Sequence, residues 1–217
     1  MKSDVYKINN AVEKIKTGKN TQFLDGRELK IVTGKLKKNE YNVYYPYKDS
    51  EKVMLYTGKI PKVKLFKIYT VENIRHQDIL GSLFALNIDS SYFGDIVLYN
   101  DYYYVFVSDD LALYIKNNLK MVGNKKVLLE EVDLSVLDNY ERKYEEKEMI
   151  ISSLRIDNVV SGIINTSRKV ALDKIKNKEV VVNYDVMNKN SYILKENDIF
   201  SIRRYGKYKF VGIVKST

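Results

Sequence analysis

Residues 95–108 read DIVLYNDYYYVFVS, and this stretch decides the fold of the middle of the chain. Two strand-like runs, Asp95–Tyr99 and Tyr102–Ser108, flank Asn100 and Asp101. Asn and Asp are favoured in two-residue hairpin turns, where the backbone takes positive φ angles. The stretch therefore predicts an antiparallel β-hairpin.

The segments on either side of this hairpin complete a domain. Alternating apolar residues predict a strand that begins near Lys62, and periodic apolar residues predict the flanking helices. The further elements expected are a helix over Gln77–Leu86, a helix over Asp110–Leu119 capped by Asp109, and a last strand over Lys126–Val132. The order βαββαβ is that of ferredoxin-like and RNA-recognition folds, so we predict an RRM-like domain over residues 61–133.

A small mixed α/β unit is predicted over residues 1–60. Apolar residues at helical spacing from Val5 to Ile15 predict a first helix that ends at Gly18. A second helix is expected over Leu24–Leu36, followed by strands at Tyr41–Tyr47 and Lys52–Thr57. Residues 134–150 form a charged connector, with a helix expected over Leu134–Lys147.

Residues 151–217 predict a compact unit of two helices and several strands. Ser153 and Ser167 are placed to cap the two helices, and only Asn165 and Thr166 separate them, so the helices must meet at a sharp angle. Strands are expected at Val180–Asn183, Ile199–Arg204 and Tyr208–Val214. The overall class is α+β.

Positive charge is concentrated in this last part. Residues 152–217 contain 13 Lys and Arg against 6 Asp and Glu, which contributes +7 of the chain's net +9. A basic surface on a small folded unit indicates a polyanionic partner. The chain has no cysteine, no leader-like apolar segment and no apolar run long enough for a membrane helix, so we expect a cytoplasmic protein without disulfides or thiolate chemistry.

The C-terminal part resembles the RNA-binding domain of ribosomal protein S4. The matching residues begin with Leu154-Arg155-Ile156-Asp157, continue with Ser167-Arg168-Lys169 and Ala171, and end with Val180, Val182, Asn183, Leu194, Lys195 and Asp198. Lys178 and Asn197 stand where that pattern usually has glycine. The resemblance implies an S4-type (αL) RNA-binding domain over residues 151–217.

A second resemblance covers nearly the whole chain. Three groups of residues are similar to motifs of the YlmH family of bacterial RNA-binding proteins. They are His76, Gln77, Asp78, Leu80, Gly81 and Leu83, then Phe93-Gly94-Asp95-Ile96, and the N-terminal Phe23, Leu24, Arg27 and Glu28. This resemblance implies a place on the large ribosomal subunit near peptidyl-tRNA, in rescue or quality control of stalled translation.

The candidate RNA-binding residues lie in the C-terminal part. Arg155 and Arg168 fall in the first turns of their helices, where a cation opposes the helix dipole, so a bound phosphate explains their placement more easily than stability does. Asp157 is expected to orient Arg155. The remaining candidates are Lys169, Lys174, Asn183, Arg203, Arg204, Lys207 and Lys209.

The strand over residues 102–108 carries Tyr102, Tyr104 and Phe106 on one face. These rings could stack on RNA bases, but the favoured alternative is that they pack against a neighbouring domain or simply reflect the Tyr-rich composition. His76 lacks the partners of a catalytic triad. Its neighbour Asp78 could bind it or cap the helix, and helix capping or a domain contact is the favoured role. Glu130 and Glu131 point to opposite faces, so they form no acid/base pair.

Three hypotheses remain open. The first is a monomeric, non-catalytic protein that binds rRNA and tRNA on the large ribosomal subunit, with no metal or other cofactor. The second is an adaptor that binds a protein partner through its middle domain, linked to cell division. The third and least favoured is an RNA-modifying enzyme, for which no catalytic motif is found.

Overall fold

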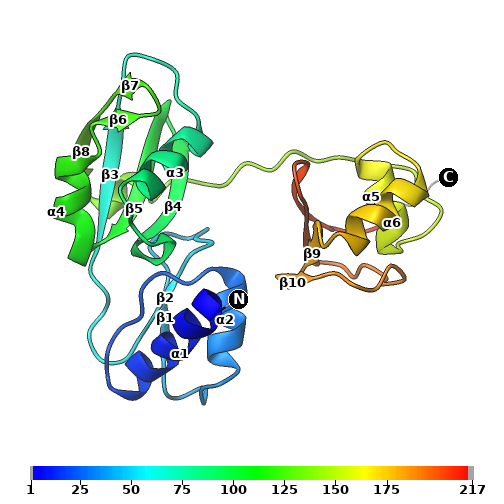
Figure 1. Cartoon of the computed structure of the whole chain (residues 1–217), viewed down its shortest axis with the longest axis horizontal. Coiled ribbons are helices and arrows are strands. Elements are labelled where there is room, and N and C mark those ends of the chain that lie inside the picture. The colour runs from blue at the N-terminus through cyan, green and yellow to red at the C-terminus, as the bar shows by residue number, and fades with distance from the viewer. Residues whose placement is uncertain (1, 215–217) are drawn as a thin grey trace. The chain divides into compact units, whose positions relative to one another are not determined.

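The computed structural model describes residues 2–214, with side chains from Val5 onward, and the chain divides into two compact units. The first unit is Met1–Lys143 and the second is Tyr144–Thr217 (Figure 1). The expected N-terminal and middle parts thus share one unit, and their boundary at residue 60 stays a prediction. No helix among residues 2–214 is long and apolar enough to cross a membrane.

The N-terminal part of the first unit contains two helices and a two-stranded sheet. These elements are α1 (Lys2–Lys16), α2 (Gly26–Thr33), β1 (Asn42–Tyr44) and β2 (Met54–Tyr56), and the two strands pair antiparallel. Helix α2 is shorter than expected because Asp25 and Glu28 form a capping box that fixes its start, while Leu24 pairs with Val53 as a β-bridge. Gly18 follows α1 with a φ of 76°, as a C-terminal glycine does.

The middle of the chain forms a four-stranded antiparallel sheet with two helices. The strands are β3 (Val63–Tyr69), β4 (Phe93–Tyr99), β5 (Tyr102–Ser108) and β8 (Leu128–Val132), in the spatial order β4-β5-β3-β8. The helices are α3 (His76–Ala85) and α4 (Asp109–Asn118), and a short 3₁₀ turn, η1 (Ser90–Tyr92), precedes β4. Asn100 and Asp101 have φ angles of 46° and 66°, as the hairpin prediction requires.

Two details of this region differ from the expectation. A small hairpin, β6 (Met121–Val122) and β7 (Lys125–Lys126), lies between α4 and β8 and was not predicted. Such two-residue strands carry too short a pattern to detect. Helix α4 begins at Asp109 itself with Ser108 at the cap position, so the expected capping role of Asp109 is wrong.

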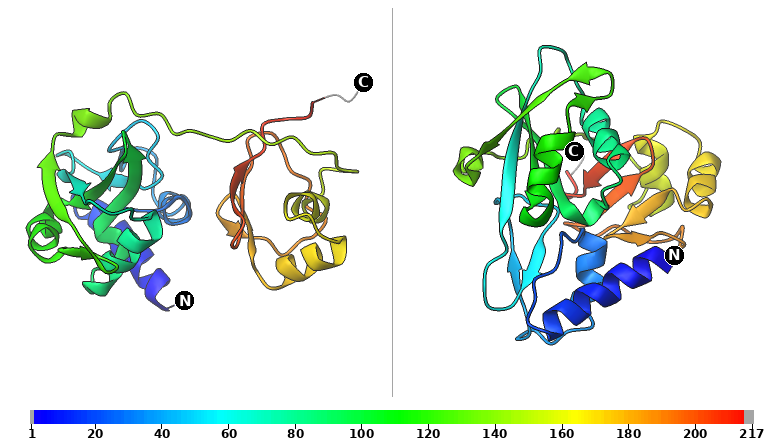
Figure 2. Two further views of the ribbon diagram at one scale, coloured as in Figure 1. Left: turned by 90° about the horizontal axis from the view of Figure 1, so that it is seen from above. Right: turned by 60° about the vertical axis from the view of Figure 1, so that its left-hand side comes forward.

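Helices α3 and α4 cover one face of the four-stranded sheet (Figures 1 and 2). Phe66, Val105 and Val107 point from the sheet into this core, where Leu83 and Ile115 meet them from the helices. All five side chains are fully buried. The valine face of β5 therefore packs on the helices, and the aromatic face lies on the opposite side of the sheet.

The opposite face of the sheet is also partly covered. Phe106 and Tyr104 of β5 pack in a core with Phe23, Tyr47 and Leu137, and the Tyr47 ring stacks on the Phe106 ring at 5.0 Å. Phe106 and Tyr104 are 0% and 3% exposed. Packing of these two rings inside the protein, the favoured alternative, is thus confirmed.

A polar joint fixes the N-terminal part to strand β4. The Asp95 carboxylate accepts hydrogen bonds from the Tyr47 hydroxyl (2.8 Å) and from the backbone N–H groups of Glu51 (2.7 Å) and Lys52 (3.2 Å). Gly94 lies beside the Phe23 ring, where a Cβ atom would come within 2.8 Å of the ring. The Gly94-Asp95 pair therefore has a structural role at this joint.

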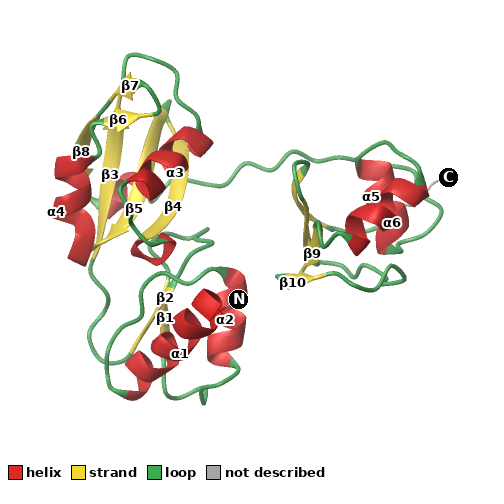
Figure 3. Cartoon of the chain, viewed as in Figure 1, coloured by secondary structure: helices red, strands yellow, loops and turns green. Residues whose placement is uncertain are grey.

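The expected helix over residues 134–147 is wrong. Only a 3₁₀ turn, η2 (Leu134–Leu137), forms, and residues 140–151 contain no helix or strand (Figure 3). Tyr140 packs on the first unit's core, and the Arg142 backbone N–H donates to the Asp49 carboxylate at 3.0 Å. These contacts hold the chain extended, and the charged residues beyond them offer no apolar face that would stabilise a helix.

The second unit packs two helices on a second four-stranded antiparallel sheet. The helices are α5 (Ile156–Ile163) and α6 (Arg168–Lys176), and the strands β9 (Val180–Val182), β10 (Asp185–Val186), β11 (Ile199–Ile202) and β12 (Gly206–Lys209) lie in the order β10-β9-β11-β12. Ile156, Ala171 and Ile202 are fully buried between the two layers. Asn165 turns the corner between the helices with a φ of 49°.

One of the two predicted helix caps of this unit is present, and its last strand is shorter than predicted. Ser167 caps α6 as expected, but Ser153 does not cap α5, because Arg155 occupies the cap position and the Ser153 hydroxyl instead accepts from the Asn158 amide. The last strand ends at Lys209, not at Val214, because its partner β11 begins at Ile199, opposite Lys209.

Lys178 and Asn197 adopt the backbone conformation that glycine favours. Their φ angles are 61° and 70°, within the left-handed region. The turns of the S4-like pattern are therefore formed here without glycine. The cost is smaller at Asn197, because Asn enters this region more readily than Lys.

Candidate nucleic-acid interface

The nine candidate RNA-binding residues all lie in the second unit, and most have exposed side chains. Lys169 extends from the first turn of α6, and the others that are exposed are Arg168, Arg203, Arg204, Lys207 and Lys209. Arg203 and Arg204 lie at the turn that joins β11 to β12. The cations thus form two groups, one at the start of the helices and one on the turn and second strand of the β11–β12 hairpin.

Lys174 and Tyr205 connect these two groups. The Lys174 ammonium donates to Glu179 at 2.8 Å and lies 5.2 Å from the centre of the Tyr205 ring. The hydrogen bond from Lys174 is the main cause of the lowered pKa of Glu179, and the nearby charges of Arg203 and Arg204 act in the same direction. Helix α6 and the β11–β12 turn are therefore neighbours.

Tyr205 lies between the strands expected at Ile199–Arg204 and Tyr208–Val214 and was not among the candidate RNA-binding residues. Tyr205 is 46% exposed and lies among cations, an arrangement that suits stacking with a nucleic-acid base. The run Arg203-Arg204-Tyr205 was the signal that could have identified it.

At the N-terminal ends of α5 and α6, Arg155 and Arg168 both bind Asp157. Arg155 donates through Nε (3.2 Å) and Nη2 (3.0 Å), and Arg168 donates through Nε (3.1 Å) and Nη2 (2.8 Å). The Asp157 side chain is 0% exposed, whereas those of Arg155 and Arg168 are 35% and 52% exposed. The predicted pairing of Asp157 with Arg155 is present, and its pairing with Arg168 is a further finding.

Asp157 has a lowered pKa. Burial would raise the pKa, but the hydrogen bonds from Arg155 and Arg168 outweigh that effect and keep the carboxylate charged. This carboxylate also places a negative charge at the N-terminus of α5. Pairing with Asp157 therefore explains why two arginines lie at helix N-termini. The unfavourable interaction of these cations with the helix dipoles does not by itself require a bound phosphate.

Asn183 is engaged within the fold. Its amide Nδ2 donates to Asp198 at 2.8 Å, and its Oδ1 accepts from the backbone N–H of Ile199 at 3.0 Å. Asp198 also accepts from the Tyr192 hydroxyl at 2.9 Å and from the Lys195 backbone N–H at 2.8 Å. Burial would raise the pKa of Asp198, but these hydrogen bonds together lower it. The geometry gives Asn183 a structural role, and its contact with RNA stays a prediction.

Acid is expected to destabilise the second unit through Asp157 and Asp198. Both folded-state pKa values lie below the usual value of 3.8, so their stabilising effect is complete above that pH and is lost as the pH falls through the folded-state values. Melting temperatures followed by circular dichroism should therefore fall as the pH is lowered below about 4. Asp198→Asn should flatten that dependence, and an unchanged slope in this variant would contradict the assignment.

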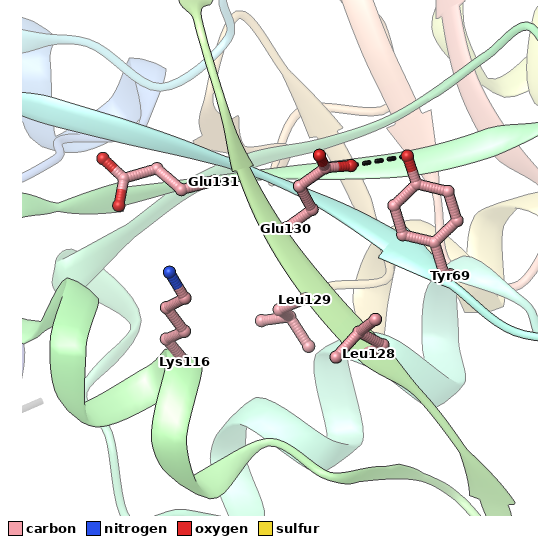
Figure 4. Close-up of a pocket in the computed structure, with 6 residues that line it drawn as sticks. All are labelled: Tyr69, Lys116, Leu128, Leu129, Glu130 and Glu131. Atoms are coloured by element: carbon pink, nitrogen blue, oxygen red, sulfur yellow. Dashed lines mark hydrogen bonds between the residues drawn. The ribbon is translucent and has the colours of Figure 1, made fainter.

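Strand β8 borders an open hollow of about 570 Å³, shown in Figure 4. Within it the Tyr69 hydroxyl donates to Glu130 at 2.5 Å, while Glu131 binds Lys64 on the other face of the strand at 2.6 Å. Lys116 also lines the hollow. The two glutamates are thus turned apart, as predicted, and the residues that line this hollow present no acid/base pair.

His76 is the first residue of α3, and burial lowers its pKa. Its neighbour Asp78 accepts hydrogen bonds from the Arg75 backbone N–H (3.0 Å) and from the Arg75 guanidinium (2.8 Å). Asp78 therefore closes the start of α3, which agrees with a capping role at this site.

Three comparisons relate the chain to known proteins. Residues 62–136 match a family model described as a putative RNA-binding domain in YlmH. Over 210 residues the chain is 30% identical to the ribosome-associated protein quality control protein P2 of Bacillus subtilis (strain 168), and the match covers 91% of this chain and 82% of the relative. The fold is similar to that of the cell division protein ylmH from Streptococcus pneumoniae, with a TM-score of 0.50 and 20% identity over 63% of this chain and 93% of that one.

Proposed function

Because the chain belongs to the YlmH family, we propose that it is a non-catalytic RNA-binding protein that acts in ribosome-associated quality control. It binds structured rRNA on the large ribosomal subunit beside peptidyl-tRNA, as a cytoplasmic monomer. The observation that carries this proposal is the set of exposed cations on α6 and the β11–β12 turn. Lysine and arginine side chains in such a set neutralise phosphates and release counterions.

The second unit supplies the main RNA contact in this proposal, as an S4-type domain. Its sharp helical corner places Arg155, Arg168 and Lys169 at one end, and the β11–β12 turn adds further cations beside α6. Phosphate binding by such groups fixes the position of a protein on folded RNA without reading its sequence.

The RRM-like domain does not offer RNA an open sheet face on the side of Tyr104 and Phe106. Tyr104 and Phe106 lie under Phe23 and Tyr47, so bases have no access to the centre of that face. Tyr102 is 38% exposed at the end of the face, with the Lys67 ammonium 3.6 Å from its ring centre. Of the three rings on this face of β5, Tyr102 is therefore the one that a base could reach, with Lys67 beside it.

The proposal is tested by removing exposed cations whose side chains form no hydrogen bond or ion pair with the residues that the structure describes. The variant Lys169→Gln, Arg203→Gln, Lys209→Gln is expected to weaken binding to purified bacterial large ribosomal subunits and to reduce the slope of log K against log salt by about 2 to 3. Co-sedimentation at about 50 to 200 mM KCl measures both quantities.

The matched control removes the same charge from the first unit. Lys37, Lys38 and Lys59 are exposed there, and their change to Gln should leave affinity and slope close to those of the wild type. Equal losses in the two variants would show a non-specific charge effect, and no loss in either would refute binding through the second unit.

A further inference from the structure

Asp157 lies in the first turn of α5, and its hydrogen-bonding capacity is filled by contacts there and with Arg168 at the start of α6. Its Oδ1 accepts from Arg155 Nε and from the backbone N–H of Asn158 at 3.0 Å, and its Oδ2 accepts from Arg155 Nη2 and from both Nε and Nη2 of Arg168. A carboxylate offers about four lone-pair sites. This buried group therefore has no site left for a ligand, and any role in binding must act through its two arginines.

Each arginine keeps part of its guanidinium available. Asp157 takes the Nε and Nη2 side of both, and neither guanidinium donates to another residue in the part of the chain that the structure describes. The Nη1 groups remain, on side chains that are 35% and 52% exposed. Two cations around one anion also leave the cluster with a net positive charge.

We propose that Asp157 is a positioning residue that holds Arg155 and Arg168 as a preformed pair for a backbone phosphate of the bound RNA. The inference rests on the proposed function and adds the ligand class of this corner and the part that Asp157 plays in it. Arginine binds phosphate through paired N–H groups in a fixed geometry. A side chain that is already immobilised loses less conformational entropy when it binds, so Asp157 increases affinity although its own charge repels phosphate.

The proposal is testable because Asp157→Asn would have two opposite effects on RNA binding, one through the added positive charge and one through the loss of arginine positioning. If Asp157 only neutralised the arginines or braced the helices, Asp157→Asn would add one positive charge and strengthen RNA binding. If Asp157 positions the arginines, the same change weakens binding in spite of the added charge. Asp173→Asn is the matched control, because Asp173 is an exposed residue of α6 and its change alters the net charge equally.

We expect full-length Asp157→Asn to bind purified large ribosomal subunits about tenfold more weakly than the wild type, with a salt slope reduced by about 1. Asp173→Asn should bind as tightly as the wild type or more tightly. A folded Asp157→Asn protein, verified by circular dichroism, that binds as tightly as Asp173→Asn would overturn the proposal.

Arg168→Lys decides the question if Asp157→Asn does not fold. This change keeps the charge and removes the planar fork, so the proposal predicts a loss of about fivefold or more, and unchanged affinity would overturn it. Failure of the proposed function is recognised separately, because the wild type itself would then not sediment with the subunits.

Discussion

Changing Arg155 and Arg168 together to alanine is expected to lower the free energy of unfolding of the second unit by about 3 to 5 kcal/mol. Asp157, which is fully buried beside its two arginines, would keep the backbone N–H of Asn158 as its remaining donor among those described above. Removing the partners of a buried charge costs much more than the net stabilisation that the ion pair provides. Urea unfolding followed by far-UV circular dichroism measures this loss.

The triple variant that also carries Asp157→Asn serves as the control. It removes the unpaired charge, so it should recover a substantial part of the lost stability. A double alanine variant as stable as the wild type would show that Asp157 is readily solvated and is not held by its arginines. Because of the expected instability, loss of ribosome binding in the double variant would not distinguish a lost contact from an unfolded unit.

Gly94→Ala is expected to destabilise the first unit by about 1 to 3 kcal/mol. The new Cβ would lie 2.8 Å from Phe23 Cε1 and 3.0 Å from Phe106 Cβ. Both phenylalanines are fully buried, so neither can move aside without disturbing the core between the N-terminal part and the sheet. Chemical denaturation measures the loss, and faster hydrogen exchange in β4 would localise it.

Gly81→Ala is the matched control for this prediction. Gly81 lies within α3, and apart from its chain neighbours and the nearby backbone of its own helix no atom lies within 4 Å of the position of its absent Cβ. Alanine there should be neutral or stabilise the helix by about 0.5 to 1 kcal/mol. If both variants lost equal stability, the close packing of Gly94 against Phe23 would not explain the result.

Local patterns predicted the elements of the sheet and helices well. The hairpin at Asn100-Asp101 and the valine face of β5 follow from side-chain alternation and turn chemistry, which act between neighbours in the sequence. The cap at Ser167 was found for the same reason. The caps at Asp109 and Ser153 were placed wrongly because several polar residues stand near each helix start, and tertiary contacts choose among them.

Features that join distant residues were not predictable in this way. The covering of Phe106 by Tyr47 and the sharing of Asp157 by two helices depend on which surfaces meet in the folded chain. The motif containing Gly94 and Asp95 was recognised, but its role as a joint needed the coordinates. The helix expected after Leu137 is absent for a related reason. Contacts of Tyr140 and Arg142 with distant residues hold this segment extended in place of the helix that local sequence predicted.

The covered sheet has a consequence for how fragments of this protein behave. A polypeptide that starts at residue 61 would lack Phe23, Tyr47 and Met54, and would expose Leu65 and Phe106 to water. Such a truncated piece should self-associate and capture other proteins indiscriminately. Pull-down experiments on binding partners therefore need the whole first unit as bait. During synthesis, Phe23, Tyr47 and Met54 can pack against β5 only after that strand has left the ribosomal exit tunnel.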